Sequence, residues 1–224
     1  MKNRLDALVT AVLAVAAILA TGTFAYRTFF PSAAVTIVRG DPPRKMAEWD
    51  SVFALGRRVA GDQNSLATAV VFADLECPAC RDFHINTLRR AEAKHGNKLQ
   101  VLYIHYPLSY HRQALPAARA TECVAAVSDV GKWIDLLFTK QDSLGLKTYG
   151  AFAHDIGIPD TSRINSCASN ADTDARIAAG SALGNKVGVS GTPTVVLNGW
   201  IFSTIPGESV IDSAVQTAQR LGTK

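Results

Sequence analysis

The hydrophobic pattern of the chain predicts a sheet region, interrupted by a helical region and then resumed. Residues 66–75, LATAVVFADL, form an apolar run between turn residues, which is typical of a strand buried on both faces of a sheet. A helix is predicted over 78–95, and residues 98–108, KLQVLYIHYPL, predict a second strand that Pro107 ends. Strand, helix and strand make one crossover unit, so we expect two parallel strands.

The remaining pattern is mostly helical before strands return. Apolar residues recur at helical spacing over 109–187, including helices predicted at 149–156 and 171–183. Residues 192–205, TPTVVLNGWIFSTI, read as a strand, an Asn-Gly turn and a second strand, which together predict a β-hairpin. An amphipathic helix is predicted over 208–221. The pattern therefore indicates a helical block inserted into an α/β sheet domain.

The N-terminus carries an export or anchoring signal. Lys2 and Arg4 precede roughly twenty mostly apolar residues, 7–26, a length that spans a bilayer. We favour an uncleaved anchor with its basic end in the cytoplasm. The alternative is a cleaved signal peptide, for which residues 32–34, Ser-Ala-Ala, offer a passable site.

Between this segment and the first core strand, the sequence predicts little regular structure. Pro42 and Pro43 resist regular structure, and residues 46–59, MAEWDSVFALGRRV, predict one short amphipathic helix. We therefore expect a linker and a short helix over 31–64.

Composition and charge limit the classes of function that the protein can have. The 224 residues are 48% hydrophobic and 19% charged, which is ordinary for a globular protein. The net charge of +4 and the absence of a long Lys/Arg run argue against nucleic-acid binding. The four cysteines, an even number, fit an exported protein whose thiols form disulfides.

Cys77 and Cys80 form a CPAC pair at the start of the first predicted helix. A zinc site needs about four ligands, usually two such pairs, and the chain has one pair, so we expect no metal. A purely structural disulfide across two residues constrains almost no chain entropy. A fold that has lost its redox activity is a further alternative. The position of the pair favours redox chemistry.

The two sulfurs are predicted to have different tasks. Near a helix N-cap, the Cys77 thiolate would face unpaired backbone N–H groups and the positive end of the helix dipole, which lower a thiol pKa. Pro78 and Ala79 support this helix start, since a proline in the first turn loses no hydrogen bond. We expect Cys77 to be an exposed attacking sulfur and Cys80 a shielded resolving sulfur.

Other polar residues near the pair are weaker candidates. Asp74 and Glu76 flank the cysteines and are candidate proton relays for Cys80, although solvated acids at a strand end explain them equally well. His84 lies about two turns from Cys77, and we expect a surface histidine there. For His105 and His111 we expect packing between the sheet and the helical block.

Three motifs, in order, resemble the DsbA-like branch of thioredoxin-fold thiol-disulfide oxidoreductases, in its membrane-anchored or secreted bacterial form. They are FADLECPACRDF, YIHYPLSYHRQALPAARATECV and GVSGTPTVVLNG, with a helical insertion between the last two, and the resemblance covers roughly residues 66–224. It implies an α/β thioredoxin fold with an inserted α-helical domain, after an N-terminal transmembrane or signal helix. The expected divisions are 1–30 (anchor or signal), 31–64 (linker), 65–107 and 187–224 (thioredoxin fold), and 108–186 (insertion).

The resemblance also assigns roles to residues far from the CPAC pair. It implies that Pro193 follows a cis peptide bond and lies beside the pair, where a residue without an N–H cannot compete for the reactive sulfur. The backbone of Thr192 would then pair with an extended substrate. A trans proline that merely starts a strand is the alternative.

Cys123 and Cys167 both fall in the insertion. If Cys77 pairs with Cys80, one pairing remains for these two, and we expect a structural disulfide. Closing a loop of about 45 residues stabilises by roughly 4 kcal/mol in the chain-entropy model. Two buried free thiols are the alternative.

The function implied by the resemblance is donation of the Cys77–Cys80 disulfide to reduced exported proteins. The implied partners are these substrates, a quinone-linked membrane protein that reoxidises the pair, and the membrane itself; no cofactor is implied, and we expect a monomer on the extracytoplasmic side. Ala79 stands where strong oxidases carry a histidine, which weakens the case for an unusually strong oxidant. A reductase or isomerase, and a non-catalytic binding or chaperone module, remain alternatives.

Overall fold

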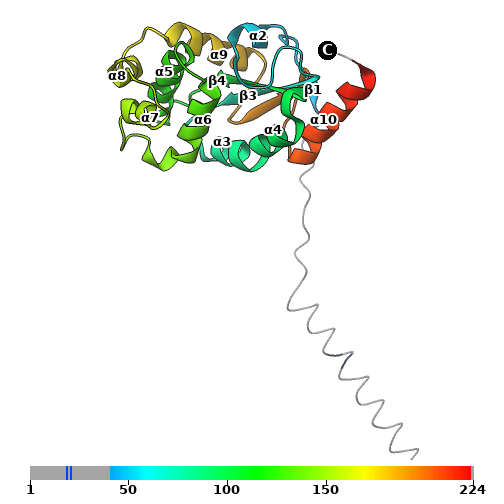
Figure 1. Ribbon diagram of the computed structural model, residues 1–224. Helices are drawn as coiled ribbons and strands as arrows, with labels where there is room; N and C mark the ends of the chain where they lie inside the picture. The colour runs from blue at the N-terminus through cyan, green and yellow to red at the C-terminus, as the bar shows by residue number, and fades with distance from the viewer. Residues whose placement is uncertain (1–18, 20, 22–40, 223–224) are drawn as a thin grey trace, which may run out of the picture. The chain divides into compact units, whose positions relative to one another are not determined.

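The computed structural model describes residues 19, 21 and 41–222 (Figure 1). The predicted anchor or signal segment, and the alternative cleavage site at 32–34, lie outside the described residues, apart from positions 19 and 21. Within the described ranges, no helix is long and apolar enough to cross a membrane.

Within residues 41–222, a six-stranded sheet forms the centre of the fold, with the strand order β1-β6-β5-β3-β4-β2. β3 and β4 are parallel, as predicted for a crossover unit, and every other neighbouring pair is antiparallel. The strands are β1 (Arg44–Lys45), β2 (Arg57–Ala60), β3 (Ala67–Ala73), β4 (Leu99–His105), β5 (Thr194–Leu197) and β6 (Trp200–Ile201).

The predicted hairpin joins β5 to β6. Asn198 and Gly199 both have positive φ, 48° and 83°, which a tight two-residue hairpin turn requires and which this residue pair tolerates best. The Asn198 side chain also accepts a hydrogen bond from the Thr68 N–H at 2.8 Å, so the turn is fastened to β3. The hairpin prediction is confirmed.

One long helix follows β3, and a π-helical turn interrupts it. It consists of α3 (Pro78–Phe83), the π turn η1 (His84–Leu88) and α4 (Arg89–His95), followed by the short 3-10 turn η2 (Gly96–Lys98). The helical insertion then contains α5 (Ala114–Ala125), α6 (Val130–Thr139), the 3-10 turn η3 (Gln141–Ser143), α7 (Tyr149–Asp155), α8 (Thr161–Ser169) and α9 (Asp174–Lys186). The short helix α2 (Ser51–Leu55) and the C-terminal α10 (Glu208–Leu221) complete the fold.

Alternate residues of β3 face two separate hydrophobic cores, one on each side of the sheet. Ala69, Val71 and Ala73 belong to the core that includes α4, α6 and α10. Val70 and Phe72 belong to the smaller core beneath α2 and α9. Figure 1 shows α2 and α9 on one side of the sheet and α3, α4 and α10 on the other. This two-sided burial explains the unbroken apolar run in the sequence.

Two strands come from the range predicted as a linker and short helix. β1 pairs with β6, and β2 pairs with β4, so both edge strands of the sheet come from this range. Residues 57–59 are therefore extended, although the sequence predicts helix. Gly56 is extended at φ −69° and ψ 139° and ends α2 early, and Arg57 then ion-pairs with the buried Glu122. A local sequence pattern cannot predict an ion pair between residues so far apart in the sequence.

The predicted disulfide between Cys123 and Cys167 is present and joins α5 to α8. Its Cα atoms are 6.4 Å apart, and 44 positions separate the residues in sequence. The bridge therefore closes a long loop inside the helical insertion.

Candidate active site

The CPAC pair lies where the central strand β3 ends and α3 begins. A turn connects the two elements, since the Cys77 N–H donates to the Asp74 carbonyl at 3.2 Å. Cys77 is the N-cap, with an extended backbone at φ −73° and ψ 121°, and Pro78 follows as the first helical residue. The predicted helix start is confirmed, and it directs the unpaired N–H groups of the first turn toward the Cys77 sulfur.

The loop before β5 lies directly over the Cys77 sulfur. The Thr192–Pro193 peptide bond is cis, and the Cys77 thiol donates to the Thr192 carbonyl across 3.4 Å. Cys77 retains 6% of its surface and Cys80 retains 2%. The prediction of an exposed Cys77 is wrong, because the Thr192 loop covers it, although Cys80 is the more shielded of the two.

The surroundings of Cys77 lower its thiol pKa from 9.0 to about 5. The largest cause is a hydrogen bond from the Cys80 thiol, which outweighs the opposing effect of burial. The Thr192 side chain and the backbone N–H groups of Cys80 and Ala79 lower the pKa further. Within the described residues the buried Thr192 hydroxyl has no other hydrogen-bond partner, so it is free to donate to the thiolate.

Cys80 has the opposite behaviour. Burial raises its pKa far above the usual range, and the neighbouring Cys77 raises it further. Burial likewise raises the pKa of the Tyr103 hydroxyl, and the acidic groups of Cys80, Asp74 and Cys77 nearby raise it further. The site therefore holds one sulfur as a thiolate at neutral pH and the other as a thiol.

Asp74 and Glu76 hold the backbone next to the cysteines. Both Asp74 carboxylate oxygens are engaged: one accepts from the Glu76 N–H at 2.7 Å, and the other from the Leu108 N–H at 2.8 Å and contacts His111 Nδ1 at 2.8 Å. Glu76 accepts from the backbone N–H of Gln113. These contacts fasten the loop after β4 to the active-site turn, and the proton-relay role of the two acids stays a prediction.

Two of the histidines are buried beside carboxylates. His84 keeps 5% of its surface, its Nε2 lies 2.6 Å from Asp135 Oδ1, and its ring lies 4.7 Å from that of Phe138. The predicted surface histidine is therefore wrong, because α6 of the insertion covers this face of the helix. His105 is also buried, with Nε2 3.2 Å from the carboxylate of Glu122.

Sequence reasoning missed two residues of the site. The side-chain amide of Gln141, in η3, donates to the carbonyls of Leu75 and Cys77 at 2.8 and 3.0 Å. Tyr103 lies in β4 with a buried hydroxyl that has no hydrogen-bond partner among the described residues. Neither position has a local signal, since one follows a helix and the other occurs in an ordinary apolar strand.

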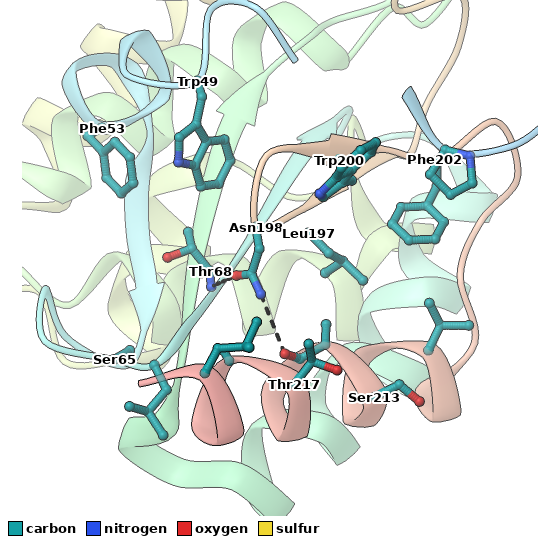
Figure 2. A pocket seen from close by; sticks show the side chains of 16 residues that line it. Trp49, Phe53, Ser65, Thr68, Leu197, Asn198, Trp200, Phe202, Ser213 and Thr217 are labelled. Atoms are coloured by element: carbon teal, nitrogen blue, oxygen red, sulfur yellow. Dashed lines mark hydrogen bonds between the residues drawn. The ribbon is translucent and has the colours of Figure 1, made fainter. Parts of the chain in front are cut away.

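An apolar groove of about 850 Å³ lies near the other end of β3, between the β5–β6 hairpin and α10 (Figure 2). Its walls include the rings of Trp49, Phe53, Trp200 and Phe202, and no charged side chain of the described part of the chain lines it. Neither cysteine of the CPAC pair borders it. Within residues 41–222, no group of three His, Cys, Asp or Glu side chains could hold a metal.

Comparisons with known proteins agree with this geometry. The family model described as thioredoxin matches residues 54–217. A comparison with curated protein sequences finds no match.

Several solved structures share the fold. BdbD from Bacillus subtilis, in its oxidised form, is similar with a TM-score of 0.63 and 19% identity, over 72% of this chain and 91% of that chain. A thioredoxin-like oxidoreductase from Silicibacter pomeroyi has a TM-score of 0.63 and 22% identity, over 76% and 97%. The thiol-disulfide exchange protein α-DsbA2 from Wolbachia pipientis has a TM-score of 0.58 and 23% identity, over 78% and 91%.

These neighbours confirm the resemblance to DsbA-like proteins at the level of the fold. The thioredoxin family model spans more than half of the sequence, and on that ground the chain belongs to the thioredoxin family.

Proposed function

We propose that this protein is a thiol-disulfide oxidoreductase that donates its Cys77–Cys80 disulfide to reduced exported proteins. The observation that carries the proposal is the difference between the two sulfurs, one with its pKa lowered to about 5 and the other with its pKa raised. The thiolate is the reactive form of a cysteine, and a sulfur with a low pKa leaves readily, so the low pKa of Cys77 favours its release from a mixed disulfide with a substrate.

The reaction proceeds in two exchanges. A substrate thiolate attacks the Cys77 sulfur of the enzyme disulfide, so a mixed disulfide forms at Cys77 while Cys80 leaves and takes up a proton. A second substrate thiolate then attacks the substrate sulfur of that mixed disulfide and releases Cys77 as a thiolate. The substrate loses two electrons and two protons in total, and the enzyme pair gains the two electrons.

Thr192 and Pro193 supply the substrate-binding edge in this proposal. The Thr192 carbonyl lies 3.4 Å from the Cys77 sulfur, so an extended peptide paired with this backbone would bring its own sulfur to Cys77. Pro193 has no N–H that could compete for the thiolate.

The low pKa of Cys77 also supports the oxidising direction. A stabilised thiolate favours the reduced pair, which makes the disulfide form the stronger oxidant. Ala79 contributes no charge, but its backbone N–H and the Cys80 thiol lower the Cys77 pKa without one. We propose that a quinone-linked membrane protein restores the disulfide after each cycle, outside the cytoplasm, with the N-terminal segment as anchor and the protein as a monomer.

The direction is tested by the reduction potential of the Cys77–Cys80 couple, combined with capture of mixed disulfides by Cys80→Ala in the native membrane. A potential of about −120 to −200 mV and captured exported proteins support the oxidase. A potential of about −270 mV indicates a reductase instead. A protein with no titratable couple and no captured partner is a binding or chaperone module, and the proposal then fails.

A further inference from the structure

Gln141 connects the helical insertion to the turn that carries Cys77. It begins η3, directly after the C-cap of α6. Its side chain is buried, with 8% of the residue exposed, and its Nε2 donates to the carbonyls of Leu75 and Cys77 at 2.8 and 3.0 Å. One amide group from the insertion therefore holds two carbonyls of the active-site turn, those of the residues on either side of Glu76.

The other hydrogen bonds of the turn hold its N–H groups and the Cys77 carbonyl, so among the described residues Gln141 is the partner of the Leu75 carbonyl. The Asp74 side chain and carbonyl hold the N–H groups of Glu76 and Cys77, which fixes the donors of the turn. The Cys77 carbonyl also accepts the first helical bond of α3, from the Arg81 N–H at 3.1 Å. Without Gln141, the buried Leu75 carbonyl would have to turn toward another donor, since a buried carbonyl without a partner is unfavourable.

The position of these carbonyls matters for the sulfur. Each carbonyl oxygen of this turn carries partial negative charge, and the amide hydrogens of Gln141 compensate it. Rotation of the Cys77 peptide plane would also move the sulfur away from the N–H groups at the start of α3. Both effects act in the same direction, against the thiolate.

We propose that Gln141 is a positioning residue of the redox site, through which the helical insertion sets the acidity and reactivity of Cys77. This inference rests on the proposed function. It assigns to the insertion a part in the chemistry: the insertion fixes the geometry of the turn, and through it the reactivity of the thiolate.

Gln141→Met is the informative variant, because methionine is similar in length and volume but has no N–H to donate. Asp142→Asn is the matched control. It alters the adjacent residue and removes the 3.0 Å ion pair with Arg81, on the same active-site helix, but leaves the Gln141 amide in place. The pKa of Cys77 is measured in the reduced proteins from thiolate absorbance between pH 3 and 9.

We expect a Cys77 pKa of about 5 in the wild type and in Asp142→Asn. In Gln141→Met we expect a pKa at least about one unit higher, a tenfold loss of thiolate stabilisation. A Gln141→Met protein that titrates like the wild type overturns the inference, even where its thermal midpoint falls, since a merely structural residue would lower stability without moving this pKa.

If Gln141→Met does not fold, as judged by circular dichroism, Gln141→Asn tests the same point with an amide that is one methylene too short to reach both carbonyls. An unchanged pKa in that variant also overturns the inference. The titration needs no substrate. Absence of exchange activity in the wild type would therefore contradict the proposed function, while the titration would still decide the role of Gln141.

Discussion

The reduced protein should become more stable relative to the oxidised protein as the pH rises from 5 to 8. Cys77 has a pKa of about 5 when folded and an ordinary value of 9.0 when unfolded. A group whose pKa is lowered by folding contributes stability that is complete above the unfolded pKa and is lost as the pH falls through the folded pKa. The oxidised protein lacks this contribution, because disulfide sulfurs do not titrate.

The slope rises through pH 5 toward about 1.4 kcal/mol per pH unit, and the contribution of the thiolate reaches about 2.7 kcal/mol at pH 7. Cys80 does not disturb this window. Its raised pKa keeps it protonated in the folded protein, and its unfavourable effect begins only near the ordinary thiol pKa of 9.0. The same 2.7 kcal/mol corresponds to about 60 mV of additional oxidising power at pH 7.

Urea unfolding of the oxidised and reduced proteins at pH 5, 6, 7 and 8 measures this difference. Other ionisable groups are the same in both forms, so their pH dependence cancels. Cys77→Ser, kept reduced, should follow the pH dependence of the oxidised protein. A difference between the two wild-type forms that stays flat from pH 5 to 8 would refute the assignment of Cys77 as a stabilised thiolate.

Three further perturbations test the surrounding structure. Replacing Cys123 and Cys167 by alanine should lower the free energy of unfolding by about 4 kcal/mol in urea while exchange activity persists; a loss under about 1 kcal/mol contradicts the entropic role given to a loop of 44 positions. Glu122→Gln should lower the free energy of unfolding by about 3 kcal/mol near pH 7, because Arg57 loses its buried partner. The wild type should lose this stability as the pH falls from about 4.5 to about 2, whereas the variant should show no such loss, so equal acid profiles would contradict the prediction. Burial raises the pKa of Glu92 to about 7, so its charged form is unfavourable in the folded protein. Glu92→Gln should therefore raise the free energy of unfolding at pH 8 and leave it unchanged at pH 4. An equal effect at both pH values would contradict a raised pKa of Glu92.

The sequence predicted the parts of the fold that local patterns control. The two-sided burial of β3 requires an unbroken apolar run, and the hairpin turn requires residues such as Asn198 and Gly199 that accept positive φ. The helix start at Cys77 and Pro78 follows from the same local logic.

The features that it missed depend on distant contacts. β2 is extended because it pairs with β4 and because Arg57 meets Glu122, which is 65 positions away in sequence. His84 is buried because Asp135 and Phe138 of α6 lie against it. Gln141 contacts the active-site turn only after η3 has packed against it, and the residues around Gln141 in the sequence do not predict that contact.

The central claim is that Cys77 is the reactive thiolate and Cys80 the protected thiol. The most direct measurement is the rate of alkylation of the reduced protein by iodoacetamide between pH 3 and 9, with the modified cysteine mapped by mass spectrometry. The account predicts modification at Cys77 alone, with a rate that rises to a plateau around a midpoint of about pH 5. Equal modification of both cysteines, or a single midpoint near the ordinary thiol pKa of 9.0, would contradict it.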